Sequence, residues 1–403
     1  MITLLLVIIY LAFISLGLPD SLLGAAWPAM QSDIGAPLET GGILFMTIAG
    51  GTIISSLVSG KVLKRFGTGK VTLVSVSMTA IALLGFNFAH SIGWLIICAI
   101  PLGLGAGAVD AGLNDYVATN YEAHHMSWLH CFWGVGATLG PVIMAQFIST
   151  GDNSWRNGYM VIACIQIFLV LVLILSLPLW KRVAKNCNTI LDEVTKESIM
   201  INHVEGEKDI KPLQVKGGKL ALVSFLFYCG AEATMNLWGS SYLVNIKGLN
   251  PPTAAAWVSF YFAGITIGRF ITGFITFRMS NRTLIRIGQT IALIGAIILI
   301  LPLPSTFSLI GFIIVGLGLA PIFPCMLHET PIRFGKKHSQ TIMGYQMAVA
   351  YTGTTFIPPL LGFTASQLTI GILPFCIVVF VGAMIWSSER INYVLKKYKK
   401  SFF

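Results

Sequence analysis

The stretch Gly103-Leu-Gly-Ala-Gly-Ala-Val-Asp110-Ala-Gly-Leu-Asn114-Asp115 decides how this chain folds. It continues an apolar run that begins near Trp94 and has no charged residue before Asp110, which is long enough for a helix to cross a bilayer. Gly103, Gly107 and Ala111 recur every four residues and form a row of small side chains on one helix face. Because such a row allows a second helix to approach closely, the pattern predicts a bundle of packed membrane-spanning helices.

Asp110 and Asn114 are the polar residues of this stretch that we expect to carry function. They are four residues apart and therefore lie one turn apart on the same helix face. A carboxylate inside a spanning helix costs about 2.5–3.5 kcal/mol on insertion scales, so such groups usually face a cavity and serve protons, ions or substrate. We predict a proton-coupling role for Asp110 and a substrate contact for Asn114. The alternative is an aspartate that is buried and paired for packing.

The composition indicates a polytopic membrane protein. Of the 403 residues, 55% are hydrophobic and 10% are charged, whereas a soluble domain has about 25% charged residues. The first apolar run, residues 1–30, is too long for the core of a signal peptide, so we interpret it as the first spanning helix. The seven cysteines include no C-x-x-C pair, so we expect no metal site and no disulfide framework, and we expect no cofactor.

Twelve apolar segments are long enough to span a membrane, and most connections between them are short. We therefore predict an all-α membrane protein with twelve transmembrane helices in two pseudo-symmetric six-helix bundles. The predicted spans are 3–30, 39–60, 70–89, 92–119, 126–149, 157–180, 218–246, 253–277, 283–303, 306–328, 339–366 and 368–391.

An internal repeat relates the two halves of the chain. Adding 213 to a residue number maps Gly103-Leu-Gly105 onto Gly316-Leu-Gly318, and maps Gly51 onto Gly264. Two six-helix halves related by a parallel repeat, with a site at the midplane between them, are typical of one class of transporter. The segment between the halves is polar and has no apolar period, so we expect a flexible linker, or one with a short surface helix. The predicted division is an N-terminal bundle of residues 1–181, a cytoplasmic linker of residues 182–217 and a C-terminal bundle of residues 218–403.

The basic residues predict the orientation of the chain in the membrane. Arg156, Lys247 and Arg269 are exceptions; every other Lys and Arg falls in a segment on the same side as the N-terminus. Because cytoplasmic segments carry an excess of Lys and Arg, we predict that both termini are cytoplasmic. The net charge of +10 is then explained by membrane orientation, and we expect no nucleic-acid partner.

The first span contains Gly17-Leu-Pro19-Asp20, with a proline and a carboxylate at mid-depth. Pro19 leaves a backbone carbonyl without its helical donor and can kink the helix, which membrane helices tolerate where the opening faces a cavity. Asp20 is the second proton-coupling candidate, and a purely structural pairing is the alternative.

Further polar residues in later spans are candidates for substrate contact. Glu232 and Asn236 share one face of the seventh span, and Trp238 lies near that face. A carboxylate, an amide and an indole supply acceptors, donors and a flat apolar surface, as a sugar ring requires. His130 in the fifth span and Gln346 in the eleventh complete the predicted set. A structural role is the alternative for His130, and a packed ion pair is the alternative for Glu232.

Several charged residues predict pairing or gating rather than substrate contact. Arg269 in the eighth span is always charged and must meet a carboxylate or an anion. Glu329 and Arg333, at the cytoplasmic end of the tenth span, are expected to form a latch near Arg278. Exposed ion pairs are worth little, so a latch role requires partial burial.

Span two ends in Gly60-Lys-Val-Leu-Lys64-Arg65-Phe-Gly67-Thr-Gly69-Lys70, which resembles the loop signature of the major facilitator superfamily. That signature is a glycine, three residues, usually an aspartate, and then basic residues around a glycine. Here Lys64 stands where the aspartate is usual. Asp115 or Glu122 is therefore expected to supply the acidic partner of Arg65 in a cytoplasmic latch.

Other motifs resemble the branch of this superfamily that contains the proton-coupled fucose permeases and related hexose permeases. The resemblance covers all twelve spans and implies symport of substrate and proton, with span-one and span-four carboxylates as coupling groups. Asp20 and Asp110 match those positions. The specific motifs are Asp110 with Asn114, Tyr228-x-Gly230-x-Glu232 with Trp238, Gly268-Arg269, and Gly316-Leu-Gly-Leu-Ala-Pro321-Ile-Phe-Pro324.

We therefore predict a monomeric secondary transporter that moves a small sugar or similar polar solute with protons by alternating access. The expected location is the plasma membrane of a bacterium. Sodium coupling, and efflux of a drug or metabolite by proton antiport, remain alternatives. A membrane enzyme or sensor is not supported, because the sequence has no nucleophile motif and no large domain outside the membrane.

Overall fold

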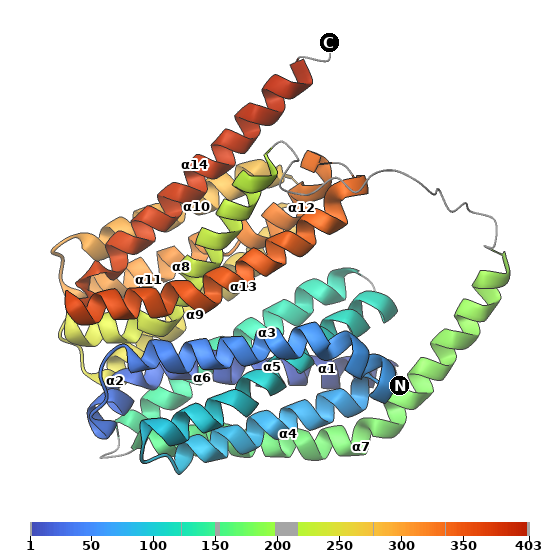
Figure 1. Ribbon diagram of the computed structural model, residues 1–403, viewed down its shortest axis with the longest axis horizontal. Coiled ribbons are helices and arrows are strands. Elements are labelled where there is room, and N and C mark those ends of the chain that lie inside the picture. Colours follow the sequence, from blue (N-terminus) through green and yellow to red (C-terminus); the bar gives the residue numbers. More distant parts are fainter. Residues whose placement is uncertain are drawn as a thin grey trace.

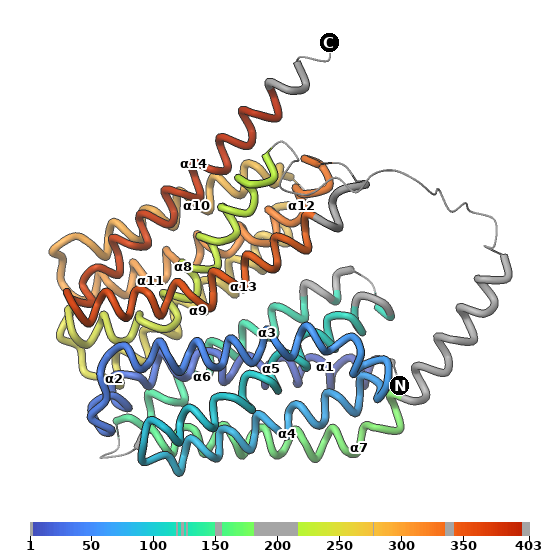
Figure 2. The backbone as a smooth tube through the Cα atoms, viewed as in Figure 1, coloured from blue at the N-terminus to red at the C-terminus, as the bar shows by residue number. Residues whose placement is uncertain are grey.

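The computed structural model describes a chain that is almost entirely helical (Figures 1 and 2). The described residues are 2–121, 123–149, 154–197, 217–276, 278–334 and 336–400. The N-terminal helices are α1 (Ile2–Asp20), α2 (Leu22–Ile34), α3 (Thr40–Phe66), α4 (Thr68–Asn87), α5 (Ile92–Asn120), α6 (Ala123–Ile148) and α7 (Ser154–Glu197). The C-terminal helices are α8 (Gly218–Asn245), α9 (Pro251–Ile275), α10 (Asn281–Ile300), α11 (Ser305–Leu319), α12 (Ile322–Phe334), α13 (Lys336–Gln367), the short η2 (Ile370–Ile372) and α14 (Leu373–Lys400).

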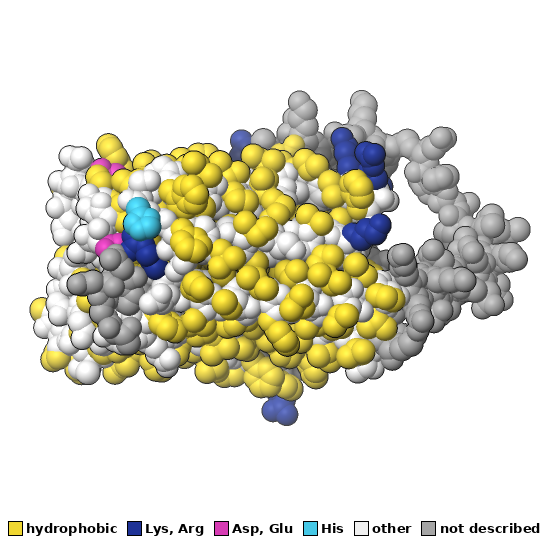
Figure 3. All heavy atoms as spheres, turned by 90° about the horizontal axis from the view of Figure 1, so that it is seen from below, with side chains coloured by type: hydrophobic (Ala, Val, Ile, Leu, Met, Phe, Trp, Pro, Cys, Tyr) yellow, Lys and Arg dark blue, Asp and Glu magenta, His cyan; other side chains and the backbone are white. Residues whose placement is uncertain are grey.

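The outer surface of this bundle is apolar, as a bilayer requires. Among the described residues, eleven helices are long and apolar enough to cross a membrane, counting α1 with α2 and α11 with α12 as one span each. Helix α13 occupies the position of the eleventh predicted span and carries more polar residues. Figure 3 shows a broad apolar belt on one face, with several Lys and Arg side chains at the right-hand end and others at the left-hand end and the edges. The predicted fold of twelve spans in two bundles is confirmed.

The two bundles lie one above the other in Figure 1, with α1–α7 below and α8–α14 above. They touch through α2 with α8, α3 with α13, and α6 with α9. Helix α7 continues beyond the predicted end of the sixth span to Glu197, so residues 182–197 of the predicted linker are helical. The remainder of that linker, residues 198–216, lies outside the described residues.

The internal repeat appears again in the packing of the glycine rows. A Cβ atom placed on Gly103 would lie 2.1 Å from the carbonyl oxygen of Ile48, and one on Gly316 would lie 2.2 Å from that of Tyr261. The offset of 213 maps each residue of the first pair onto the second. Helix α5 therefore packs on α3 as α11 packs on α9, at backbone-to-backbone distance. The same offset relates Gly105 against Ser75 to Gly318 against Gly288.

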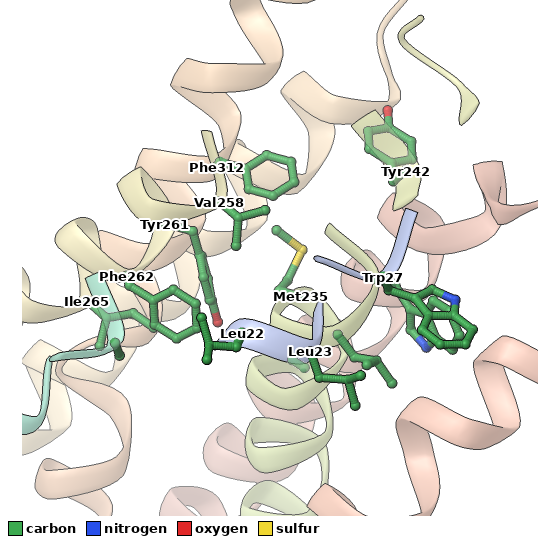
Figure 4. Close-up of a cluster of buried hydrophobic side chains, with 14 of the residues drawn as sticks. Leu22, Leu23, Trp27, Met235, Tyr242, Val258, Tyr261, Phe262, Ile265 and Phe312 are labelled. Carbon is green, nitrogen blue, oxygen red and sulfur yellow. The ribbon is translucent and has the colours of Figure 1, made fainter. Parts of the chain in front are cut away.

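An apolar cluster joins the bundles around α2, the helix that follows Asp20 in the chain. Leu22, Leu23 and Trp27 of α2 are buried, and Trp27 has no exposed surface. Figure 4 shows these side chains among residues of α8, α9 and α11. Their neighbours in the cluster include Met235, Tyr242, Val258, Tyr261, Phe262, Ile265 and Phe312. The bundle interface is therefore closed by apolar packing at this end.

We expect the substitution Gly103→Ala to destabilise the protein, because the added methyl group would collide with the backbone of α3. Overpacking of this kind costs about 1–3 kcal/mol. Gly50→Ala is the matched control, since a Cβ at Gly50 in α3 meets nothing within 4 Å. Thermal unfolding in detergent, followed by fluorescence-detected size exclusion, should show a lower Tm for Gly103→Ala alone. Equal Tm values for the two variants would contradict this packing.

Candidate functional site

Asp20 lies where the first span is interrupted, between α1 and α2. The indole Nε1 of Trp133, on α6, donates a hydrogen bond to Asp20 Oδ2 at 2.7 Å. The Nδ2 of Asn236, on α8, donates to the backbone carbonyl of Asp20 at 3.0 Å. Both donors approach the end of α1, one from its own bundle and one from the opposite bundle. Asp20 therefore lies at the interface of the two bundles.

Asp110 and Asn114 lie together on α5, as their spacing predicts. Asn114 Nδ2 donates to Asp110 Oδ1 at 2.9 Å and to the backbone carbonyl of Asp110 at 3.0 Å. Asp110 is within electrostatic range of Asp20 on α1 and of Tyr351 on α13. Asp20, Asp110 and Asn114 are partly buried. Two acidic side chains from separate spans are therefore brought close together inside the membrane region.

Glu232 and Arg269 form an ion pair within the C-terminal bundle, with Arg269 Nη2 3.1 Å from Glu232 Oε1. Their side chains are 21% and 18% exposed, respectively. The predicted need of Arg269 for a carboxylate is thus met by Glu232. The Arg269 guanidinium also lies 5.6 Å from the centre of the Trp133 ring, within range of a cation–π interaction.

Trp133 connects the acidic pair to the ion pair, and we did not predict a role for it. Its ring nitrogen bonds Asp20 and its ring face meets Arg269, so one indole links α1 to α9. A tryptophan within an apolar helix usually serves packing, so the position of Trp133 in the sequence does not by itself indicate a functional role. Its position one turn from His130 was the available hint.

Of the other predicted substrate residues, Trp238 and Gln346 are buried and His130 is exposed. Trp238 has no exposed surface, and its Nε1 donates to the backbone carbonyl of Pro358 at 2.8 Å. Gln346 is 2% exposed and its Oε1 accepts a hydrogen bond from Thr330 Oγ1. His130 is exposed, makes an edge contact with the Phe13 ring, and is within electrostatic range of Arg269.

The predicted latch residue Glu329 is buried and contacts two arginines. Arg282 Nε donates to Glu329 Oε2 at 2.9 Å, and Arg333 Nε lies 3.2 Å from the same oxygen without hydrogen-bond geometry. Arg333 also donates to Asn392 on α14. Arg282, rather than the predicted Arg278, supplies the second cation. The Arg333–Glu329 contact lies within α12, and the other two join helices of the C-terminal bundle.

The remaining predicted gate residues are at the surface. Arg65, Asp115 and Arg278 are exposed, and the Arg65 guanidinium lies 5.3 Å from the centre of the Phe66 ring. Glu122, the other expected partner for Arg65, lies outside the described residues. The structure therefore separates a buried polar centre from an exposed basic surface at one end.

The arrangement of two six-helix bundles with a polar centre between them defines a membrane transporter. The sequence model of the Major Facilitator Superfamily matches residues 9–358, so this chain belongs to that superfamily. Its membership confirms the predicted resemblance. It also confirms that the chain is a multi-span transporter and not an enzyme.

Related sequences include a sugar transporter. The glucose/mannose transporter GlcP of Bacillus subtilis (strain 168) is 24% identical over 380 residues, which cover 93% of this chain and 92% of the relative. The bypass of stop codon protein 6 of Saccharomyces cerevisiae is 22% identical over 388 residues, with 90% and 77% covered.

Solved structures share the fold. The inward-open xylose transporter XylE from E. coli has a TM-score of 0.75 and 13% identity, covering 98% of this chain and 96% of that one. A crystal structure of a D-xylose–proton symporter has a TM-score of 0.72 and 14% identity, with 95% and 97% covered. A bacterial homologue of the human lysosomal transporter Spinster, inward-facing and unoccupied, has a TM-score of 0.74 and 12% identity, with 99% and 98% covered.

We expect a stability cycle to detect the pairing of Glu232 with Arg269. Removing one partner of a buried pair leaves an uncompensated charge and costs about 3–5 kcal/mol. Because each side chain keeps some exposure, Glu232→Gln and Arg269→Gln should each reduce the free energy of unfolding by about 3 kcal/mol, the lower end of that range, and so lower the Tm. The double variant should lose less than the sum of the two single losses.

The control for this cycle is the exposed pair Arg286–Glu389, whose side chains are 58% and 42% exposed. Exposed pairs contribute about 0–1 kcal/mol, so Glu389→Gln should change the Tm little. Additive losses at Glu232 and Arg269 would show that the two groups do not interact.

Proposed function

We propose that this transporter moves a small neutral sugar together with a proton by alternating access. The observation that carries the proposal is the placement of Asp20 and Asp110. The two carboxyl groups come from different spans, lie at the bundle interface within electrostatic range of each other, and are partly buried. Ionisable groups inside a membrane protein are costly, and they mark ion and proton pathways.

A bound proton on Asp110, with Asp20 assisting, would lower the cost of moving this centre between states. Two like charges at low dielectric repel each other, so one proton removes both the repulsion and part of the desolvation cost. The neutral centre can then be enclosed by the bundles more readily than the charged one. Coupling follows if proton and sugar favour the same state by a free-energy difference.

The chemistry around the carboxylates suits a neutral polyhydroxyl compound. Asn114 and Asn236 offer amide groups, and the ion pair of Glu232 with Arg269 offers an acceptor and donors with no net charge. The partly buried ring of Trp133 adds an aromatic surface beside them. The relatives named above as a glucose/mannose transporter and a D-xylose–proton symporter support the sugar class.

Trp238 and Gln346 stay candidates for a different state of the transport cycle. Both are buried here, so they would reach a substrate only after rearrangement. His130 is exposed and within electrostatic range of Arg269, so it could contact a solute that approaches the Glu232–Arg269 pair.

We further propose that both termini are cytoplasmic and that the protein works in the plasma membrane of a bacterium. Exposed basic residues at one end, such as Lys64, Arg65 and Arg278, support this orientation. The apolar cluster around Trp27 then closes the external side of the bundle interface.

Asp110→Asn in proteoliposomes tests the coupling role. We expect a thermal-shift screen of purified protein to select a probe among D-glucose, D-mannose and D-xylose. With that sugar, the variant should retain exchange between equal concentrations, because exchange needs no net proton movement. It should lose accumulation driven by a pH gradient, by tenfold or more, since the amide cannot bind the transported proton.

Asp33→Asn is the matched control, because Asp33 pairs with Arg156 away from the polar centre. It should keep pH-driven accumulation. Unchanged accumulation by Asp110→Asn would overturn the coupling role. Accumulation in wild-type vesicles that follows a sodium gradient instead of a pH gradient would replace the proton with sodium.

A further inference from the structure

The side chain of Gln166 bridges two other helices by hydrogen bonds in the interior of the N-terminal bundle. We call this arrangement of Gln166, Thr79 and the Ser15 carbonyl the clasp. Pro19 has no N–H group, so the carbonyl of Ser15, four residues earlier, lacks its helical donor. Gln166 of α7 supplies one, with its Nε2 2.9 Å from the Ser15 carbonyl oxygen. The Oε1 of Gln166 accepts a hydrogen bond from Thr79 Oγ1, on α4, at 2.8 Å.

The clasp is fully enclosed by protein. Gln166 is 1% exposed and Thr79 is 3% exposed. A buried amide is costly unless its hydrogen bonds are satisfied, and here both ends of the side chain are used. The residue therefore has a specific task at this position, since an apolar side chain would fill the same space without that cost.

A small cavity of ≈ 10 Å³ adjoins the clasp. Its wall includes Pro19 and Val109, which immediately precede Asp20 and Asp110 in the sequence. Ser15, Thr79 and Gln166 line it as well. The clasp thus lies against the backbone segments that carry both carboxylates.

The two sides of α1 are packed in different ways. On one side, Cβ atoms placed on Gly136 and Gly140 of α6 would lie 2.1 and 2.5 Å from the carbonyls of Ile14 and Leu18. That contact is direct and leaves no space. On the other side, the clasp and the cavity lie within an apolar cluster that includes Ala12, Leu16 and Val109. The break between α1 and α2, called the bend below, therefore has directional hydrogen bonds on this side in addition to apolar contacts.

We propose that Gln166 is a positioning residue for transport, which fixes the bend in the first span and thereby places Asp20 beside Asp110 and Trp133. This inference rests on the proposed coupling function of the two aspartates. Gln166 touches neither carboxylate, and acts through the carbonyl of Ser15. Without its donor, the bend relaxes and the hydrogen bond from Trp133 to Asp20 weakens.

The test replaces Gln166 with methionine, which is similar in shape and has no donor. Because the hydrogen bond from Trp133 favours the charged carboxylate, its weakening should move the pH of half-maximal sugar uptake to higher pH. We expect a shift of about one unit, a tenfold change in proton concentration, since one hydrogen bond to a charged group is at stake. Exchange at saturating sugar should change by less than about twofold, because the sugar contacts stay in place.

Gln289→Met is the matched control. Gln289 is also 1% exposed and lies in the C-terminal bundle, where it donates to Ser388. This variant should lose stability but keep the wild-type pH profile. A wild-type profile for a folded Gln166→Met protein would overturn the proposal. If that variant does not fold, Thr79→Val, which removes the partner hydroxyl of Gln166, should give a smaller shift in the same direction, and no shift would overturn the proposal.

Backbone hydrogen exchange separates this inference from the coupling function. Peptides covering residues 14–25 should exchange faster in Gln166→Met than in wild type, and should be unchanged in Gln289→Met. Faster exchange together with pH-independent uptake by the wild type would show that the clasp holds the bend while the coupling function fails. Unchanged exchange would overturn the clasp itself.

Discussion

The cost of placing charge inside a bilayer determines the arrangement of this protein. Asp20, Asp110, Glu232 and Arg269 all belong to helices that are otherwise apolar, so each must face protein or water rather than lipid. The structure brings these groups to the interface between the bundles, where the Trp133 indole joins Asp20 to the Arg269–Glu232 ion pair. Asp110 lies within electrostatic range of Asp20. Helix faces directed to lipid are then left to large apolar side chains. The same constraint therefore produces both the outer belt and the polar centre.

Close backbone packing makes each bundle a firm unit around that centre. Gly103 and Gly316 bring α5 onto α3 and α11 onto α9 at equivalent positions of the repeat. The ion pairs of Asp33, Glu329 and Glu389 also join helices within one bundle. Between the bundles, the side-chain hydrogen bonds of Asn236 and Ser240 end on backbone carbonyls of the first span, and the surrounding contacts are apolar. Strong directional interactions thus hold each bundle together, and weaker ones hold the bundles to each other.

Much of this could be predicted from the sequence, because the determining patterns are local. Apolar length gives the spans, and the four-residue spacing of Asp110 and Asn114 gives their hydrogen bond. The need of Arg269 for a carboxylate is general, but its choice of Glu232 depends on how α8 and α9 pack. The roles of Trp133 and Gln166 could not be predicted either, because each contacts helices that are distant in sequence. Arg282, at the start of α10, lies four residues after Arg278 in the preceding turn, and this difference is within the uncertainty of a predicted helix end.

The difference between the contacts within each bundle and those between the bundles bears on the proposed change between transport states. The bundles meet through apolar surfaces and the hydrogen bonds of Asn236 and Ser240. Among the described residues, a tilt of one bundle against the other would therefore break no ion pair. The exception is the centre, where the Trp133 ring of one bundle meets the Arg269 guanidinium of the other. Any change in charge at Asp20 alters the electrostatic environment of that indole, and hence its attraction for Arg269. On the proposed mechanism, a proton on Asp20 of one bundle would therefore change the contact of Trp133 with Arg269, which belongs to the ion pair of the other bundle.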